Sequence, residues 1–143
     1  MKRDFRTLRV HEVMTDTPVT VSPEDSLQHA LDLLEKYQVH ELPVVEQGRV
    51  IGIVTDGDLK LMTPAYPLFR DQEEIRLALR DLKIASAMTV DPVTISPEAT
   101  LLEAIKLLFE HRIESLLVTA GEQLVGLVSV SDILRLVIEQ DET

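Results

Sequence analysis

Apolar and polar positions alternate along this chain in one scheme that is used twice. Residues 14–59 align without a gap on residues 88–133, at a constant offset of 74 residues, with 17 identities in 46 positions. Fixed-period self-similarity is the mark of a repeated structural unit. Two copies are too few for a solenoid, so a pseudo-twofold pair is the more natural packing.

Each copy predicts the order β-α-β-β-α and therefore a mixed α/β (α+β) fold. The helical stripe is Leu27, Ala30, Leu31 and Leu34 in the first copy, and Leu101, Ala104, Ile105 and Leu108 in the second. Ser22-Pro23-Glu24 predicts the N-cap and first turn of that helix. The strands are predicted at 19–21, 42–45 and 50–54, and again at 93–95, 116–119 and 124–128, with a closing helix from about Asp56 or Val130.

The segments between the predicted helices and strands contain residues typical of turns and loops. Gln47-Gly48 and Gly121-Glu122 predict tight turns. The prolines in 62–67 predict a loop, and 71–82 predicts a helix that joins the copies and covers part of the core. The last helix, 131–139, has an apolar face that is also suited to a dimer contact and consists of Ile133, Leu134, Val137 and Ile138.

Composition narrows the class of protein. The chain has 143 residues, 45% of them apolar but only 3% aromatic, so Leu, Ile and Val must build the core. It has no cysteine, which excludes disulfides and thiolate zinc sites. No stretch approaches about 20 uninterrupted apolar residues. The N-terminus lacks the apolar segment of a signal peptide. We therefore expect a cytoplasmic protein that does not enter a membrane.

The net charge of −11 disfavours general nucleic-acid binding, which requires a basic surface. It does not exclude a small anionic ligand, because a local arginine or a helix terminus can override the global field. The basic run from Lys2 to Arg9 is interpreted as a solvated end.

A hydroxyl and a carboxylate stand three residues apart where the last strand of each copy meets the closing helix. These pairs are Thr55 with Asp58 and Ser129 with Asp132. One interpretation is a capping box at the helix N-terminus. The other is a ligand site, because helix N-termini favour phosphorylated ligands and a carboxylate accepts hydrogen bonds from a vicinal diol.

These repeated motifs resemble a tandem pair of CBS domains, also called a Bateman module. The resemblance covers about residues 10–139, as repeat 1 (10–62), a linker with a helix (63–83) and repeat 2 (84–139). It implies a disc-like, stand-alone module with pseudo-twofold symmetry and clefts between the repeats. It also implies an adenosine ligand (AMP, ADP, ATP or S-adenosylmethionine), a regulatory role towards an unknown partner protein, and a homodimer.

The same resemblance assigns residues to that ligand. Asp132 and Asp58 would accept the ribose hydroxyls, with Ser129 and Thr55 near the ribose or phosphate. His111 and Arg112 resemble the basic pair that touches phosphate in AMP-activated protein kinase; alternatively they are a solvated helix end. The adenine slot would involve the first and second strands of each copy, with the candidates Thr20, His40 and Pro43, and Thr94, Ser115 and Val118. For the valines and leucines of these strands the alternative is ordinary core.

The two sites are not expected to be equal. The first copy has Tyr37-Gln38 where the second has His111-Arg112, and Asp56 adds a carboxylate beside Thr55. Coulomb repulsion should weaken a polyphosphate there. His40 is a candidate phosphate contact; the alternative is a surface strand residue. Leu117 replaces the family's usual proline, which is present as Pro43.

No catalytic or metal-binding motif accompanies these features. The four histidines lack metal-ligand spacing, and no glycine-rich phosphate loop or nucleophile motif occurs. We therefore expect a non-catalytic sensor of adenine nucleotides. The rival hypotheses are a structural dimerisation module without a physiological ligand and, less well supported, an enzyme or a nucleic-acid binder.

Overall fold

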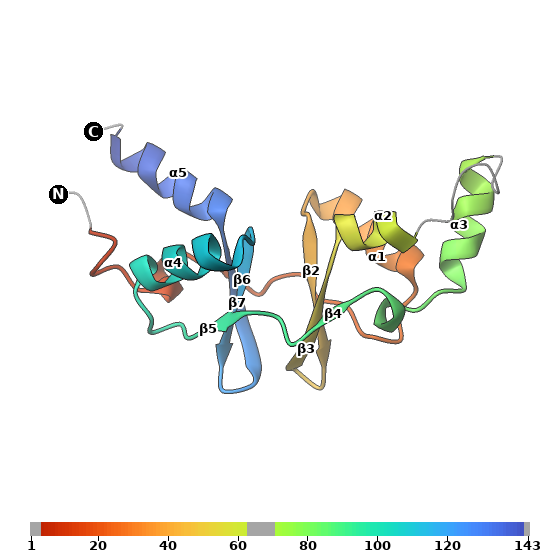
Figure 1. The fold of residues 1–143 in the computed structure, drawn as a ribbon, viewed down its shortest axis with the longest axis horizontal. Helices are drawn as coiled ribbons and strands as arrows, with labels where there is room; N and C mark the ends of the chain where they lie inside the picture. The colour runs from red at the N-terminus through yellow and green to blue at the C-terminus, as the bar shows by residue number, and fades with distance from the viewer. Residues whose placement is uncertain (1–3, 63–70, 142–143) are drawn as a thin grey trace. The chain divides into compact units, whose positions relative to one another are not determined.

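The computed structural model describes residues 4–62 and 71–141 of the chain (Figure 1). Most of the predicted loop at 62–67 lies outside the described residues. The chain divides into two compact units. The first-repeat unit is Val19–Asp91, and the second-repeat unit combines the residues up to Pro18 with those from Pro92 onward.

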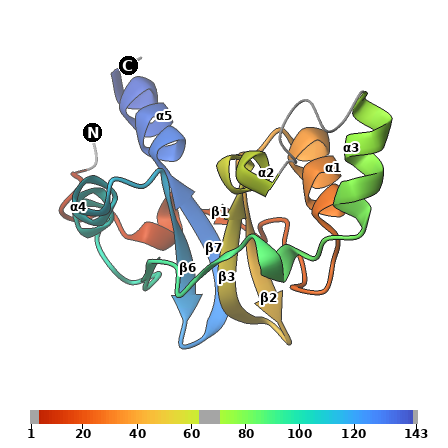
Figure 2. The same ribbon diagram turned by 45° about the vertical axis from the view of Figure 1, so that its right-hand side comes forward.

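The described part of the first-repeat unit is a small antiparallel sheet with three α-helices. Its elements are α1 (Leu27–Tyr37), β2 (Glu41–Glu46), β3 (Arg49–Thr55), α2 (Asp56–Met62), α3 (Gln72–Arg80), the 3-10 turn η2 (Ile84–Ser86) and β4 (Thr89–Val90). Strand β3 pairs with β2 on one side and with β4 on the other. Figure 2 shows helix α3 beside α1, where Leu79 enters the same core as Leu27. The prediction that this helix covers part of the core is confirmed.

The second-repeat unit follows a similar plan. Its elements are the 3-10 turn η1 (Val10–Glu12), β1 (Thr15–Asp16), β5 (Thr94–Ile95), α4 (Leu101–His111), β6 (Ser115–Ala120), β7 (Gln123–Ser129) and α5 (Val130–Asp141). The strand order is β1-β7-β6-β5, with the β5–β6 pair parallel and the others antiparallel. The β6–β7 hairpin leads directly into α5 (Figure 1). The mixed α/β class predicted from the sequence is confirmed.

Each unit contains a short strand that belongs, in sequence, to the start of the other repeat. Strand β1 lies near the start of repeat 1 but pairs with β7, with Asp16 opposite Gly126. Strand β4 lies near the start of repeat 2 but pairs with β3, with Val90 opposite Gly52. The compact units are therefore a different division of the chain from the sequence repeats. The two-residue strands β1 and β4 have no periodicity that would predict them.

The first helix of each copy starts four residues later than predicted. The side chain of Ser26 accepts a hydrogen bond from the His29 amide at 3.0 Å, which makes Ser26 the N-cap of α1. Ser22 instead begins a turn, in which its amide donates to Asp25 Oδ2 at 2.9 Å. In the second copy the N-cap is Thr100. The assignment of Ser22-Pro23-Glu24 to the helix start is wrong, because these residues form a separate turn closed by Asp25, and the helix begins only after Ser26.

The prediction of a strand at 19–21 is also wrong in the first copy, where only Val21 forms a bridge, to Val44. The second copy has the expected strand at Thr94–Ile95. Leu117 explains the difference, because its amide donates to the Val93 carbonyl at 3.4 Å. Pro43 stands at the corresponding position and has no amide hydrogen to donate.

Helix α5 buries only part of the apolar face predicted for it. Ile133 packs against the core of the second-repeat unit, whereas Leu134, Val137 and Ile138 are exposed. No helix in the described part of the chain is long and apolar enough to cross a membrane.

Candidate functional site

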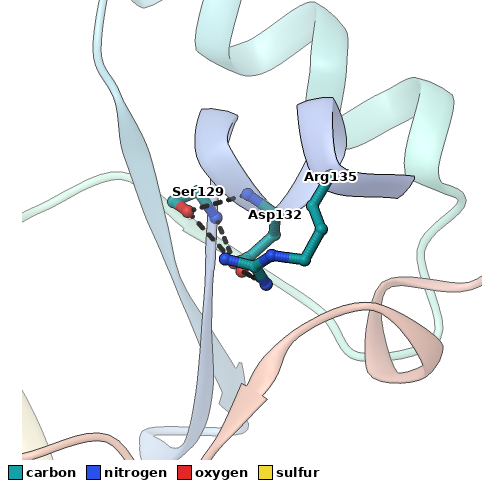
Figure 3. Close-up of polar contacts among 3 residues, drawn as sticks. All are labelled: Ser129, Asp132 and Arg135. Carbon is teal, nitrogen blue, oxygen red and sulfur yellow. Dashed lines mark hydrogen bonds and ion pairs between the residues drawn. The ribbon is translucent and has the colours of Figure 1, made fainter. Parts of the chain in front are cut away.

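The junction of β7 and α5 forms a reciprocal set of hydrogen bonds (Figure 3). Oδ2 of Asp132 accepts from the Ser129 amide at 2.9 Å and from the Ser129 hydroxyl at 3.1 Å. The Asp132 amide in turn donates to Ser129 Oγ at 3.2 Å. Ser129 directly precedes α5, and Asp132 is its third residue, so this is a capping box with Asp in the place of Glu.

The Asp132 carboxylate is nearly buried, at 8% exposure. Its second oxygen, Oδ1, faces the Arg135 guanidinium at 3.4 Å (Figure 3). The Arg135 side chain remains 65% exposed. Because burying a carboxylate without polar partners is costly, the hydrogen bonds from Ser129 and the contact with Arg135 offset that cost. Arg135 is not among the residues predicted from the sequence, although its position one helical turn after Asp132 was a usable signal.

The first copy builds the same junction between β3 and α2. The Thr55 amide donates to Asp58 Oδ2 at 2.9 Å, and the Asp58 amide donates to Thr55 Oγ1 at 3.1 Å. Both residues are half-buried. The capping-box interpretation is therefore confirmed in both copies. It does not remove the ligand interpretation, because one oxygen of each carboxylate is not used by the box.

Two more predicted residues of the second-repeat unit lie on the strands next to β7 and β6. Ser115 lies directly opposite Ser129 in the β6–β7 pair, and Thr94 pairs with Leu117 on the next strand. Val118 is fully buried in the core, so its side chain is not available to a ligand. Ser129 thus contacts the buried carboxylate, and Ser115 is its neighbour across the β6–β7 pair.

His111 and Arg112 lie at the opposite end of α4 from its N-cap. Both are exposed, and their side chains make no hydrogen bond or ion pair with any described residue. Arg112 ends the helix in the left-handed conformation, at φ 55° and ψ 45°. It lines a shallow depression with Leu108, Phe109 and Glu110. Since no hydrogen bond joins this pair to Asp132, their role at the phosphate stays a prediction.

In the first-repeat unit the predicted residues surround the β2–β3 edge. His40 Nδ1 lies 3.0 Å from Asp56 Oδ2, and both side chains are well exposed. The His40 carbonyl also accepts from the Asp56 amide at 2.9 Å. Pro43 is buried and Thr20 is half-buried. The histidine predicted to face phosphate is therefore already engaged with the carboxylate that was expected to repel phosphate.

The polar groups at these junctions are suited to binding a ligand. Among the described residues no group of three or more His, Cys, Asp and Glu side chains is arranged to hold a metal ion. A buried carboxylate with one oxygen directed away from its capping box is an acceptor for hydroxyl donors. An exposed guanidinium beside it is a donor for anionic oxygens.

Comparison with known proteins defines the class. The CBS domain family matches residues 10–62 and 79–139, and the chain belongs to this family as a protein with two CBS repeats. A CBS domain-containing protein of Dictyostelium discoideum is 36% identical over 133 residues, which cover 91% of each chain. The inosine-5'-monophosphate dehydrogenase of Korarchaeum cryptofilum is 34% identical over 80% of this chain, but only 21% of that enzyme is covered.

Solved structures agree on the fold. The CBS-pair protein CBSX2 from Arabidopsis thaliana has a TM-score of 0.80 and 25% identity, covering 95% of this chain and 98% of CBSX2. CBSX2 has also been solved in complex with AMP, and that structure has a TM-score of 0.77 and 24% identity, covering 94% and 99% of the two chains. The resemblance noted from the sequence motifs is thereby confirmed for the family and the fold.

Proposed function

We propose that this chain is a non-catalytic regulatory module that binds an adenosine ligand and signals its presence to a partner protein. The candidate ligands are AMP, ADP, ATP and S-adenosylmethionine. The observation that carries the proposal is the Asp132 carboxylate, which is buried, held by Ser129 through Oδ2, and directed to the exposed Arg135 through Oδ1. A fixed carboxylate that retains acceptor capacity is suited to the two hydroxyls of a ribose.

Further support comes from the surroundings of that carboxylate. The Ser129 hydroxyl contacts this carboxylate, and Ser115 lies opposite Ser129 on the neighbouring strand. The complex of CBSX2 with AMP supplies one example of a ligand that this fold accommodates. A ligand can change the state of the module only through a difference in its affinity for two conformations. The ribose site alone does not determine which nucleotide is preferred or which partner protein is regulated.

The alternative is a structural dimerisation module without a ligand. One observation favours it: Leu134, Val137 and Ile138 of α5 are exposed at 57%, 44% and 60%. In this account the capping boxes at both junctions would serve only to start α2 and α5. The protein would then gain no stability from any nucleotide.

Thermal unfolding of nucleotide-free protein with AMP, ADP, ATP, S-adenosylmethionine and NAD separates the two accounts. Saturation at a hundred times Kd adds about 2.7 kcal/mol to the free energy of unfolding. For a chain of this size, that raises Tm by several degrees, at roughly 2–4 °C per kcal/mol. We expect a shift with at least one adenosine ligand.

The matched variants are Asp132→Asn and Asp58→Asn, which change one carboxylate to an amide in the same motif of each copy. We compare the ligand-induced shift within each variant, so that any loss of the capping box cancels. The Asp132→Asn shift should be strongly reduced. An unchanged shift in Asp132→Asn would contradict the site, and the absence of any shift in the wild-type protein would contradict the function.

A further inference from the structure

We propose that Arg135 is the residue that makes the second-repeat site selective for phosphorylated adenosine ligands over adenosine itself. This inference rests on the proposed function and adds a specificity-determining residue to it. In the structure Arg135 neutralises Asp132. When a nucleotide binds, the guanidinium moves its contact from the carboxylate to the ligand's phosphate.

The hydrogen bonds of Asp132 place Arg135 next to the oxygen that is left for the ligand. Oδ2 accepts two hydrogen bonds from Ser129, which use both of its lone pairs. Oδ1 is the acceptor that remains, and its contact in the structure is Arg135 Nη1 at 3.4 Å. A ribose hydroxyl that donates to Oδ1 therefore either displaces this guanidinium or lies next to it.

The guanidinium is able to move. Its contact with Oδ1 is single and long, and 65% of the Arg135 side chain is exposed. Breaking this contact leaves the carboxylate held by Ser129, whose amide and hydroxyl both donate to Oδ2. A phosphate is a stronger partner for Arg135 than Oδ1, because a planar guanidinium can bind phosphate oxygens through two parallel hydrogen bonds.

Binding of a phosphate close to the Asp132 carboxylate is favoured by a cation beside that carboxylate. A phosphorylated ligand brings its negative charge towards the Asp132 carboxylate, in a chain whose net charge is already −11. Like charges a few ångströms apart repel, and the repulsion is stronger where one of them is buried. Arg135 is the cation in direct contact with that carboxylate, so it offsets the repulsion where it is largest.

The first copy provides the comparison within the same chain. At the offset of 74 residues Arg135 corresponds to Leu61, which is 86% exposed on α2. Asp58 thus has the same capping box without a cation one turn further along the helix. The difference is confined to an exposed position, where the fold does not dictate the residue type.

A purely structural role makes a different prediction. If Arg135 only holds Asp132 in place, its loss disturbs every ligand that uses the carboxylate, with or without a phosphate. If it contacts the phosphate, its loss affects AMP and leaves adenosine nearly unchanged. The ratio of the two dissociation constants therefore separates the roles.

Isothermal titration calorimetry of the full chain with adenosine and with AMP, at low ionic strength, measures this ratio. The variants are Arg135→Gln, which keeps a good helix former on an exposed position, and Arg135→Lys, which keeps the charge. Arg80→Gln is the matched control, because Arg80 is an exposed arginine at the end of α3 in the other unit.

Arg135→Gln should weaken AMP binding about tenfold, as expected for one charge-assisted hydrogen bond, and change adenosine binding less than twofold. Arg135→Lys should recover part of the loss, and Arg80→Gln should match the wild type. Equal weakening of both ligands, or no weakening of either, would overturn the role of Arg135 while leaving the proposed function intact. If the wild-type protein binds neither ligand at millimolar concentration, both the proposed function and this inference fail.

Discussion

Gly126 lies against the backbone of Thr15, a residue that stands 111 positions earlier in the chain. A Cβ atom at Gly126 would be 3.0 Å from the Thr15 carbonyl oxygen. Gly52 makes the equivalent approach, with a hypothetical Cβ 2.8 Å from the Thr89 carbonyl oxygen. The glycine at this position of each repeat therefore admits the short strand β1 or β4.

This relationship predicts that Gly126→Ala and Gly52→Ala destabilise the protein. Overpacking of this kind costs about 1–3 kcal/mol, because neighbouring atoms must move. Beside Gly126 these are the Met14 side chain and the Thr15 carbonyl, and beside Gly52 they are the Thr89 carbonyl and the Met88 side chain. Chemical denaturation should show a lower midpoint with an unchanged slope. Gly57→Ala is the control, since its nearest neighbour would be Thr55 Oγ1 at 3.6 Å, an ordinary contact. Wild-type stability in Gly126→Ala would show that β1 does not pack as described.

The N-caps give a second prediction. Ser26→Ala should lower the free energy of unfolding by about 1 kcal/mol, the usual cost of losing an N-cap side chain. Ser22→Ala should cost clearly less, because its hydroxyl accepts only a 3.4 Å contact from the Glu24 amide. Denaturant unfolding of both variants measures the difference. A larger loss in Ser22→Ala would place the start of α1 at the Ser-Pro-Glu turn after all.

Arg112 provides a variant that separates charge from stability. It occupies a left-handed conformation, which costs L-residues about 1–2 kcal/mol and glycine nothing. Arg112→Gly should therefore keep or raise Tm while it removes the guanidinium. If Arg112 contacts phosphate, this stable variant binds AMP more weakly than the wild type. Gln38→Gly, at the equivalent left-handed position of the first copy, is the control and should leave AMP affinity unchanged. Equal AMP affinity in Arg112→Gly and Gln38→Gly would assign Arg112 to the helix end alone.

The sequence was sufficient to predict most of the fold. The stripe of Leu27, Ala30 and Leu34 predicted α1, and the turn residues predicted both hairpins, because these signals are local. The pairing of β1 with β7 was beyond reach, since two residues carry no periodicity and their partner is more than 100 positions away. The helix start was misplaced because Ser22 and Ser26 satisfy the same local rule, and only the turn closed by Asp25 decides between them.

At the candidate site, the sequence predicted the local hydrogen bonds but not the contacts between elements. The spacing of Ser129 and Asp132 at a strand end predicted the capping box, because both partners lie within one helical turn. The contact of His40 with Asp56 was not predicted, since it joins the ends of two different elements. Arg135 was overlooked because a single arginine on an exposed helix face is ordinary until the burial of Asp132 is known.

The most direct test of the central claim is an AMP titration followed by backbone amide chemical shifts. The account predicts that the largest changes fall on Ser115, Ser129 and Asp132, and that Thr55 and Asp58 change less. Changes confined to Thr55 and Asp58, or none at millimolar AMP, would contradict the claim that the Asp132 carboxylate receives the ribose.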